Sequence, residues 1–261
     1  PRGSQGQFVL GDAVAIKEPT ALSFRPVGGN NVLLVGQQDE TALALAATSL
    51  LALCAQHAPG TAKIFVFDGT PEDDVNFGYL QRFAEGFPQQ IRVVERLDVL
   101  SALAAIATEV TARQKGESHD HTPCYLLIHA AHRIRDLRKE DDFGFSRRGA
   151  ERTVSGGEHF LTITRDGPPL HVFTQMWCDT PTNLGRVADR AGLREFGLRI
   201  LFQMSQNDSS LLIDSPAAAR LGRHRALYMN LEASQPEKFR PYGLPTPEWL
   251  SEVKKRLNER G

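Results

Sequence analysis

The sequence predicts an α/β fold in which helices cover both faces of a mostly parallel sheet. Two observations carry this prediction. Short, continuous apolar runs recur along the chain, and the clearest is residues 32–35 (Val-Leu-Leu-Val), which glycines bound on both sides. Such a run fits a strand that is buried on both faces. Helix-like segments separate these runs, and strands that alternate with helices favour a parallel sheet.

Each element follows from its local pattern. At the N-terminus, apolar residues 8–10 and 14–16 flank Gly11-Asp12, which predicts a β-hairpin. Buried strands are expected at 32–35, 63–67, 91–94, 124–128, 170–176, 198–204 and 225–229. Helices are expected at 40–57, 71–85, 98–114, 158–165 and 247–260. Residues 139–157 are charged and contain glycine, so a loop is expected there.

Composition is that of an ordinary globular protein. The chain has 261 residues, of which 41% are hydrophobic and 23% charged. Thirty basic side chains oppose 31 acidic ones, for a net charge of −1. This balance argues against a phosphate-binding surface over the whole chain, because such a surface needs a strong basic excess. A local basic patch is still compatible with it.

The cysteines and the apolar runs bear on location. Cys54, Cys124 and Cys178 are too few and too scattered for a disulfide framework or a zinc site, and apolar neighbours indicate that they are buried. They favour a reducing compartment, and hence the cytoplasm. No apolar run approaches the ~20 residues of a membrane helix, so no direct membrane insertion is expected.

The first residues read as an addition to the natural protein. Pro1-Arg2-Gly3-Ser4 resembles the remnant of a cleaved expression tag. Residues 1–6 are therefore interpreted as tag and linker, and residues 7–261 as one domain, the C-terminal part of a longer protein.

The turn after the strand at 32–35 is where a parallel α/β fold places a phosphate loop. Such a loop has the pattern G-x-x-x-x-G-K-[ST], whose amides and lysine hold the phosphates and whose hydroxyl holds magnesium. Of its eight positions only the first glycine is kept; the residues are Gly36, Gln37, Gln38, Asp39, Glu40, Thr41, Ala42 and Leu43. Asp39 and Glu40 suit a helix start, but their charge would repel a triphosphate.

Four separated stretches carry a family resemblance. Residues 28–36 look like the strand that leads into a phosphate loop, and residues 64–68 like a second strand that ends in Asp. Residues 171–177 look like a sensor strand, and residues 198–202 with 207–210 like a late strand and its Asp-Ser segment. In order and spacing the chain, from about residue 8 to 246, resembles the motor domain of FtsK/SpoIIIE-type ATPases. It is most similar to the degenerate later domains of type VII secretion EccC proteins. The resemblance implies a RecA-like P-loop NTPase fold.

The resemblance also locates a second altered motif. In the family, one strand ends in Asp-Glu, which serves magnesium and the attacking water. The matching strand, residues 125–128, is followed by His129 and Ala130. Imidazole is a poor magnesium ligand, and alanine cannot orient water. No catalytic residue and no cofactor are therefore assigned. The family resemblance would imply binding of ATP with magnesium, but the residues at these positions disfavour it.

Two charged groups leave alternatives open. His119, His121, His129 and His132 invite a metal hypothesis, but the two pairs should lie about 20–25 Å apart at opposite ends of one strand. No metal site is therefore predicted. Arg133, Arg135 and Arg138 lie in a mixed charge run, and Arg186, Arg190 and Arg194 recur every four residues, which gives one basic face if that segment is helical. Solvent, a neighbouring subunit and phosphate groups are all candidate partners for them.

The leading functional hypothesis is a catalytically degenerate domain that binds, assembles or regulates within a larger ATPase for DNA translocation or protein secretion. The expected partners are neighbouring ATPase domains of the same polypeptide or a homo-oligomeric ring, with a protein substrate or DNA reached through the parent assembly. Gly36–Thr41 with His129 and Gln175 would form a vestigial nucleotide pocket that could dock a peptide. The alternative is an ATP-binding DNA translocase motor domain. Under the leading hypothesis the parent protein is either free in the cytoplasm or attached to a membrane.

Overall fold

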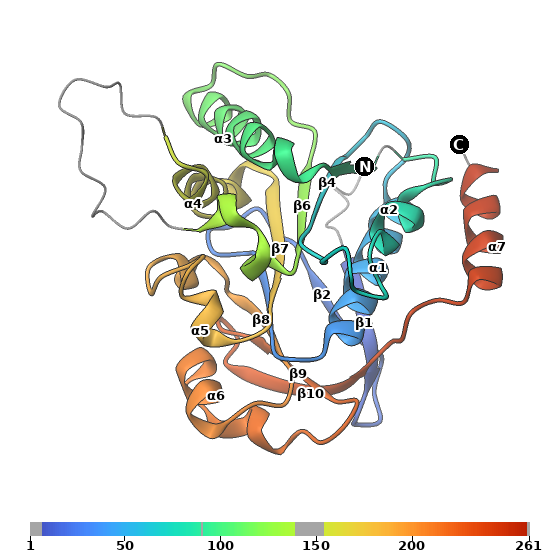
Figure 1. The fold of residues 1–261 in the computed structure, drawn as a ribbon, viewed down its shortest axis with the longest axis vertical. Coiled ribbons are helices and arrows are strands. Elements are labelled where there is room, and N and C mark those ends of the chain that lie inside the picture. Colours follow the sequence, from blue (N-terminus) through green and yellow to red (C-terminus); the bar gives the residue numbers. More distant parts are fainter. Residues whose placement is uncertain (1–6, 90, 139–153, 260–261) are drawn as a thin grey trace.

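The computed structural model describes residues 7–89, 91–138 and 154–259. Its strands are β1 (Gln7–Ala13), β2 (Thr20–Ser23), β3 (Val32–Val35), β4 (Lys63–Asp68), β5 (Ile91–Val94), β6 (Cys124–His129), β7 (Val172–Cys178), β8 (Leu198–Leu201), β9 (Ala226–Asn230) and β10 (Gln235–Pro241). Its helices are α1 (Asp39–Gln56), α2 (Tyr79–Ala84), α3 (Val99–Lys115), α4 (Gly156–Asp166), α5 (Pro181–Leu184), α6 (Gln206–Ile213) and α7 (Pro247–Asn258). Short 3₁₀ turns complete the chain, as Figure 1 shows.

The strands of this described part form one sheet in the order β2-β1-β10-β9-β8-β3-β7-β6-β4-β5. From β8 to β5 every neighbouring pair is parallel, and from β2 to β8 every pair is antiparallel. The predicted mostly parallel sheet with an N-terminal hairpin is confirmed. Strand β3 lies inside the parallel part, between β8 and β7.

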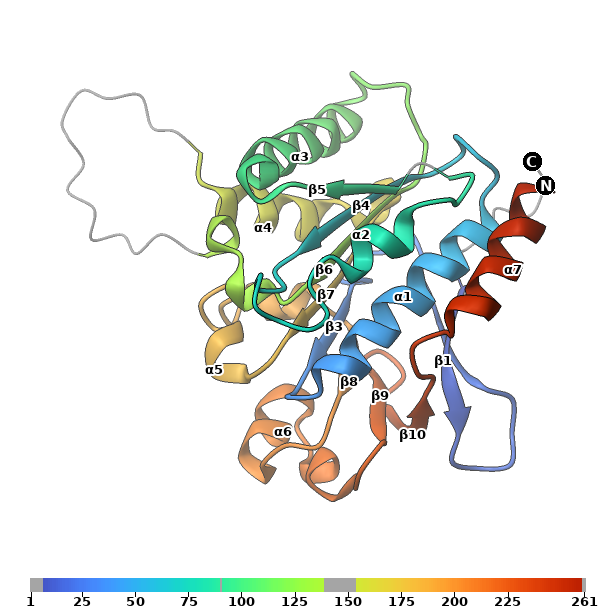
Figure 2. The ribbon, with the colours of Figure 1, turned by 45° about the vertical axis from the view of Figure 1, so that its right-hand side comes forward.

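Helices cover both faces of the sheet (Figure 2). Along β3, Val32 and Leu34 point into the core that α1 and α2 cover, whereas Leu33 and Val35 point into the core under α3 and α4. All four side chains are at most 1% exposed, which explains why this strand reads as an unbroken apolar run. The same alternation on neighbouring strands builds two cores, one on each face.

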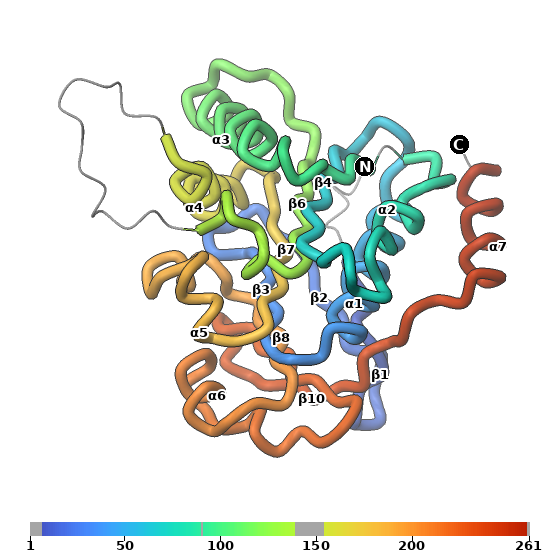
Figure 3. Tube along the Cα trace, viewed as in Figure 1, coloured from blue at the N-terminus to red at the C-terminus, as the bar shows by residue number. Residues whose placement is uncertain are grey.

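Helix α7 returns to the first of these faces. Lys254 and Asn258 donate hydrogen bonds to the Glu85 and Gly86 carbonyls at the end of α2, and Leu257 joins the core beneath α1. The tube in Figure 3 shows this C-terminal segment, in red, reaching the α1 and α2 side of the molecule. Trp249, near the start of α7, is 50% exposed, so docking of this helix leaves the indole largely uncovered.

Asn31 joins three elements immediately before β3. Its side-chain amide nitrogen donates to the carbonyls of Thr164 and Glu195, each at 2.8 Å, and its oxygen accepts from the Thr174 backbone N–H at 2.9 Å. Asn31 is fully buried, so each of these backbone groups depends on it for a partner. The bonds place α4 and β7 relative to the end of the turn that leads into β3.

Several local predictions need correction. The hairpin turn does not lie at Gly11-Asp12: β1 runs through both residues, and it pairs with β2 across residues 14–19. Gly11 fits inside the strand because a Cβ there would overlap the Arg240 backbone of β10. Residues 71–78 form turns, and the helix expected over 71–85 begins only at Tyr79.

Four of the strands and helices were missed, namely β2, β10, α5 and α6. Helix α4 begins at Gly156, where Ser155 and Glu158 form a reciprocal capping box. The interpretations of residues 1–6 and most of the loop expected at 139–157 lie outside the described residues. All three cysteines are buried and free, as predicted. Within the described ranges, no helix combines the length and the apolar character that crossing a bilayer requires.

Candidate functional site

The turn between β3 and α1 lies at the carboxyl edge of the parallel strands, where this class of fold binds ligands. Helix α1 begins at Asp39, so only Gly36, Gln37 and Gln38 connect strand to helix. Five of the eight positions that a phosphate loop would occupy therefore lie inside the helix. A three-residue connection cannot wrap its amides around a phosphate in the way that the glycine-rich loop does.

The first turn of α1 is acidic. Asp39 and Glu40 are both exposed, and Gln37 beside them is exposed as well. Gln38 and Thr41 are partly buried, and the Thr41 hydroxyl contacts the Gln38 side-chain oxygen at 3.4 Å. The two carboxylates interact favourably with the positive end of the helix dipole. Their negative charge cancels the attraction that this end would otherwise exert on an anion.

Gly36 has a packing reason to be glycine. Its φ is +136°, and a Cβ built there would lie 2.7 Å from the Phe202 Cβ. Its carbonyl accepts a hydrogen bond from the Trp177 indole N–H at 3.1 Å. The one retained residue of the phosphate-loop pattern is thus required by close packing on β8 and β7, with no need of a ligand to explain it.

Trp177 occupies the space beside this turn. It is the penultimate residue of β7, is 4% exposed, and its ring lies 4.6 Å from the His129 ring, centroid to centroid. Its burial agrees with its place at the end of an expected buried strand. Its bond to the turn was not anticipated. A lone tryptophan at the end of a buried strand was the available signal, because a buried indole N–H needs an acceptor.

His129 ends β6 and is 6% exposed. Burial lowers the pKa of His129 to about 4, and the charges of Asp68 and Asp74 oppose this shift only in part. The ring is therefore neutral at pH 7, and its Nδ1 has no hydrogen-bond partner in the part of the chain that the structure describes. Ala130 follows, with φ +53°. Its side chain is a methyl group, so neither residue at this strand end offers a side-chain oxygen as a ligand.

Gln175 is turned away from any opening. It lies in the middle of β7, is 6% exposed, and its side-chain oxygen accepts a hydrogen bond from the Ser49 hydroxyl of α1 at 2.8 Å. The bond ties α1 to the sheet. Ser49 is a further residue that the sequence analysis did not single out, since a serine inside an Ala- and Leu-rich helix carries no distinctive pattern.

Two small cavities mark the place of the predicted nucleotide pocket. One, of about 10 Å³, is lined by His129, Gln175 and Trp177 among apolar side chains. The other, of about 20 Å³, is lined by Asp39, His129, Arg133 and Trp177 together with residues 70–76 of the turn after β4. Each has room for roughly one water molecule. Asp39 and His129 thus line one cavity, and His129 and Gln175 line the other.

A much larger groove lies elsewhere. It has a volume of about 700 Å³ and is bounded by the C-terminal half of α1, by β1 and by the segment that leads into α7. Leu51, Val9, Tyr242 and Trp249 are among its lining residues, and the lining is mainly apolar.

The six arginines singled out earlier are all exposed. Arg133 and Arg138 contact His132, one through its ring and one through its carbonyl. Arg186, Arg190 and Arg194 do not share one helical face, because α5 ends at Leu184 and only a 3₁₀ turn, Gly192–Glu195, follows. The condition for one basic face, a continuous helix, is therefore not met, since α5 ends before Gly185.

The buried neutral His129 predicts a loss of stability in acid. In the unfolded chain its pKa returns to 6.5, so the unfolded state binds more protons below that value. The stability contribution is complete above pH 6.5 and is lost as pH falls toward 4, at about 1.4 kcal/mol per pH unit. Urea unfolding at pH 7 and pH 5 measures it. We expect His129→Phe to lose less stability between these pH values than the wild type, whereas exposed His119→Gln should behave as wild type. Equal losses in wild type and His129→Phe would contradict the prediction.

Comparison with known proteins gives the fold a context. No family model matches the chain, and no curated protein matches its sequence. Solved structures do match. The pCW3 conjugation coupling protein TcpA, determined as a monomer form with ATPγS, has a TM-score of 0.66 at 12% identity, over 98% of this chain and 71% of that one. The cytoplasmic domain of the type VII secretion ATPase EccC of Thermomonospora curvata has a TM-score of 0.68 at 15% identity, over 98% of this chain and 31% of that one.

A third match is EccC ATPases 2 and 3 of Thermomonospora curvata in complex with a signal sequence peptide. Its TM-score is 0.62 at 13% identity, over 99% of this chain and 49% of that one. The chain thus spans about half of that two-ATPase structure and about a third of the cytoplasmic domain of EccC. The chain has the P-loop NTPase fold of these conjugation and secretion ATPase domains, and the predicted fold class and likeness are confirmed.

Proposed function

We propose that this chain is a catalytically degenerate FtsK/SpoIIIE-type domain that serves as a binding, assembly or regulatory module of a larger ATPase. The turn between β3 and α1 carries the proposal. Its three residues enter a helix whose first turn is acidic, and its Gly36 carbonyl is bonded to Trp177, which fills the adjoining space. Phosphate binding needs free amides, a lysine and a hydroxyl at this place, and the pattern positions hold Ala42 and Leu43 instead, both 1% exposed.

The neighbouring strand end supports the same conclusion independently. Hydrolysis needs oxygen ligands for magnesium and a group that orients water. His129 and Ala130 supply neither, since His129 is a buried neutral imidazole and Ala130 has no polar side chain. The phosphate-loop positions and the end of β6 are altered separately, so one neighbouring residue could not replace the groups lacking at both places.

A binding role has suitable surfaces available. The chain matches one part of the multi-ATPase EccC structures, so neighbouring ATPase domains of the same polypeptide are the proposed partners. Arg133, Arg135 and Arg138 are exposed after the carboxyl end of β6, and they are the proposed contacts to a neighbour's phosphates. The 700 Å³ apolar groove has the size and polarity of a ligand-binding site, and the related EccC structure holds a signal sequence peptide. The likeness to the cytoplasmic domain of EccC supports a cytoplasmic location as part of the proposal.

Titration with ATP and magnesium tests the loss of catalysis. We expect no heat of binding by calorimetry and no phosphate release, because neither the phosphate loop nor the magnesium ligands are present. Tight binding with turnover would support the alternative, an ATP-binding DNA translocase, and overturn the proposal. DNA affinity that falls steeply with salt would point to a nucleic-acid module instead.

The regulatory part is tested on the parent polypeptide. We expect removal of residues 7–261 to change ATP turnover by its other ATPase domains. Unchanged turnover together with unchanged assembly would show an inert appendage and would contradict the module role while leaving the loss of catalysis intact.

A further inference from the structure

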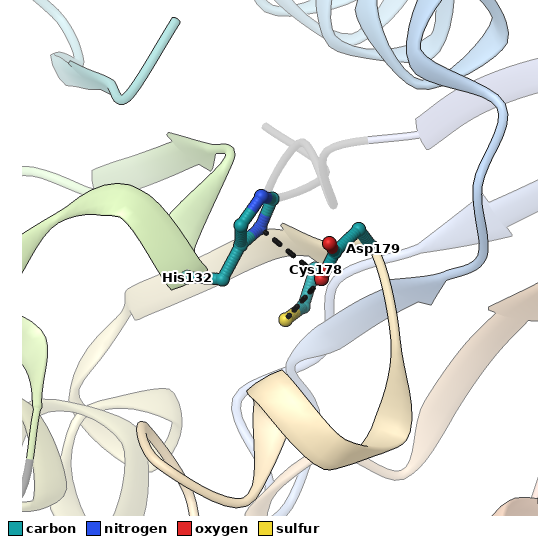
Figure 4. A group of neighbouring side chains, drawn as sticks. All are labelled: His132, Cys178 and Asp179. Carbon is teal, nitrogen blue, oxygen red and sulfur yellow. Dashed lines mark hydrogen bonds and ion pairs between the residues drawn. The ribbon is translucent and has the colours of Figure 1, made fainter. Parts of the chain in front are cut away.

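Three metal-binding side chains converge at the carboxyl ends of β6 and β7. His132 lies in the 3₁₀ turn Ala131–Arg133 after β6, Cys178 is the last residue of β7, and Asp179 follows it. One nitrogen, sulfur or oxygen atom from each lies within 4.8 Å of the others, and this is the one such group of three found among the described residues. Figure 4 shows the three side chains turned toward a common point.

Two of the three separations between these atoms are printed distances near those between the ligands of a tetrahedral metal, and the Cys178 thiol also donates weakly to the Thr180 carbonyl, at 3.6 Å. His132 Nδ1 lies 3.6 Å from Asp179 Oδ1, and Cys178 Sγ lies 3.8 Å from the same oxygen. A nitrogen-to-oxygen separation of 3.6 Å is too long for a hydrogen bond. Tetrahedral zinc, with bonds of about 2.0–2.3 Å, separates its nitrogen, oxygen and sulfur ligands by about 3.3–3.7 Å, so movements of a few tenths of an ångström would bring Asp179 to the right distance from both.

His132 provides a second, independent observation. Its side chain is only 8% exposed and its Nδ1 points at the cluster, but among the described residues that nitrogen has no hydrogen-bond partner and only the long 3.6 Å contact with Asp179. A buried ring nitrogen without a partner is rare and costly in folded proteins. A ligand at the common point would satisfy it.

The carboxylate is already held in place. Asn183 donates its side-chain amide to both oxygens of Asp179, at 2.9 and 3.0 Å, and the Thr180 hydroxyl contacts one of them at 3.3 Å. Metal-binding carboxylates are commonly oriented by hydrogen bonds of this kind. The support comes from α5, directly after the cluster.

We propose that His132 Nδ1, Cys178 Sγ and Asp179 form a binding site for a zinc-type divalent cation, with a fourth position open to water. Nitrogen and sulfur ligands select zinc over magnesium or calcium, which prefer oxygen. Cys178 binds as the thiolate, and its proton leaves to solvent. Exposed Arg133, which now donates to His132 Nε2 at 3.2 Å, turns away, because that nitrogen carries the proton once Nδ1 holds the metal.

The site differs from the four-histidine hypothesis, and it does not depend on the proposed function. His119 and His121 precede β6 and lie at its other end, and His129 is not part of the cluster. Cys178 joins it although the sequence spacing of the cysteines argued against zinc. The fold brings together residues that the chain separates.

Zinc binding to the purified, chelator-treated chain tests the proposal. We expect one Zn²⁺ per chain in competition with a chromophoric chelator, and Co²⁺ in its place should show a thiolate-to-metal charge-transfer band. Cys178→Ser should abolish that band, and Asp179→Asn and His132→Gln should each weaken binding more than about tenfold. Cys124→Ser, a buried free cysteine in the neighbouring strand, and His119→Gln are the matched controls and should leave binding unchanged.

Asp179→Asn guards against misfolding as an explanation, because this partly exposed side chain contributes little to the core. Its circular dichroism and unfolding midpoint are to be compared with wild type. The proposal is overturned if Co²⁺ gives no thiolate band, if folded Asp179→Asn binds Zn²⁺ as tightly as wild type, or if the controls lose binding equally.

Discussion

Replacing Trp177 with alanine is expected to lower the free energy of unfolding by about 3–5 kcal/mol, the usual cost of deleting a buried large aromatic side chain. The indole is 4% exposed, packs on His129 and His132, and bonds the Gly36 carbonyl. Trp177→Phe keeps an aromatic ring at this place but removes the N–H and part of the indole, so we expect a smaller loss of about 1–3 kcal/mol. Urea unfolding monitored by circular dichroism measures both.

The same variants separate two reasons for a lack of nucleotide binding. If Trp177 only blocked an otherwise competent site, Trp177→Ala would bind ATP with magnesium. We expect no binding, because Ala42 and Leu43 still replace the lysine and the hydroxyl. A Trp177→Ala loss below about 1 kcal/mol would contradict the packing role, and binding of ATP by this variant would contradict the degenerate reading of the turn.

Replacing Asn31 with aspartate is expected to be comparably damaging, although the two side chains have nearly the same shape. The amide nitrogen donates to the carbonyls of Thr164 and Glu195. A carboxylate oxygen in its place would face two acceptors in a fully buried site. An uncompensated buried charge costs about 3–5 kcal/mol, so the loss should be of that size at pH 7 and smaller in acid, where the carboxyl group is protonated.

Asn30→Asp is the matched control. Asn30 is also buried, at 5% exposure, but its side-chain oxygen accepts from the Arg25 backbone N–H, and aspartate keeps that acceptor. We expect a clearly smaller loss for this neighbour. Equal losses in the two variants, measured by urea unfolding at pH 7, would show that charge burial alone, and not the two donated bonds of Asn31, sets the cost.

The strongly apolar strands were predictable because burial on both faces leaves an unbroken pattern in the sequence. Residues 32–35 and 124–128 were predicted almost to the residue for this reason. Strand β10 was missed because only Phe239 of its seven residues is buried, and the others are polar or proline. A strand that is held by backbone pairing on both sides, as β10 is by β1 and β9, but buries only one side chain carries little signal in its sequence.

Some features of the candidate site could likewise be predicted from the sequence, and others could not. The missing lysine, hydroxyl and carboxylates could be read at Ala42, Leu43, His129 and Ala130, because those positions follow strands that the sequence predicts. The hydrogen bond from Trp177 to the Gly36 carbonyl could not be predicted from the sequence, because it joins β7 to a turn distant in the chain.

Taken alone, the order of residues settles which side chains stand at the end of each strand, since apolar periodicity and turn residues are local properties of the chain. It therefore predicts the α/β class, and it tells which residues stand at the positions where the phosphate-loop pattern would have its lysine and hydroxyl. Which of those side chains meet is a matter of strand order, and β3, β6 and β7 become neighbours only when the sheet assembles. The contact of Trp177 with Gly36 and the convergence of His132 on Cys178 and Asp179 follow from that assembly, because pairing between distant strands leaves no periodic trace in the sequence.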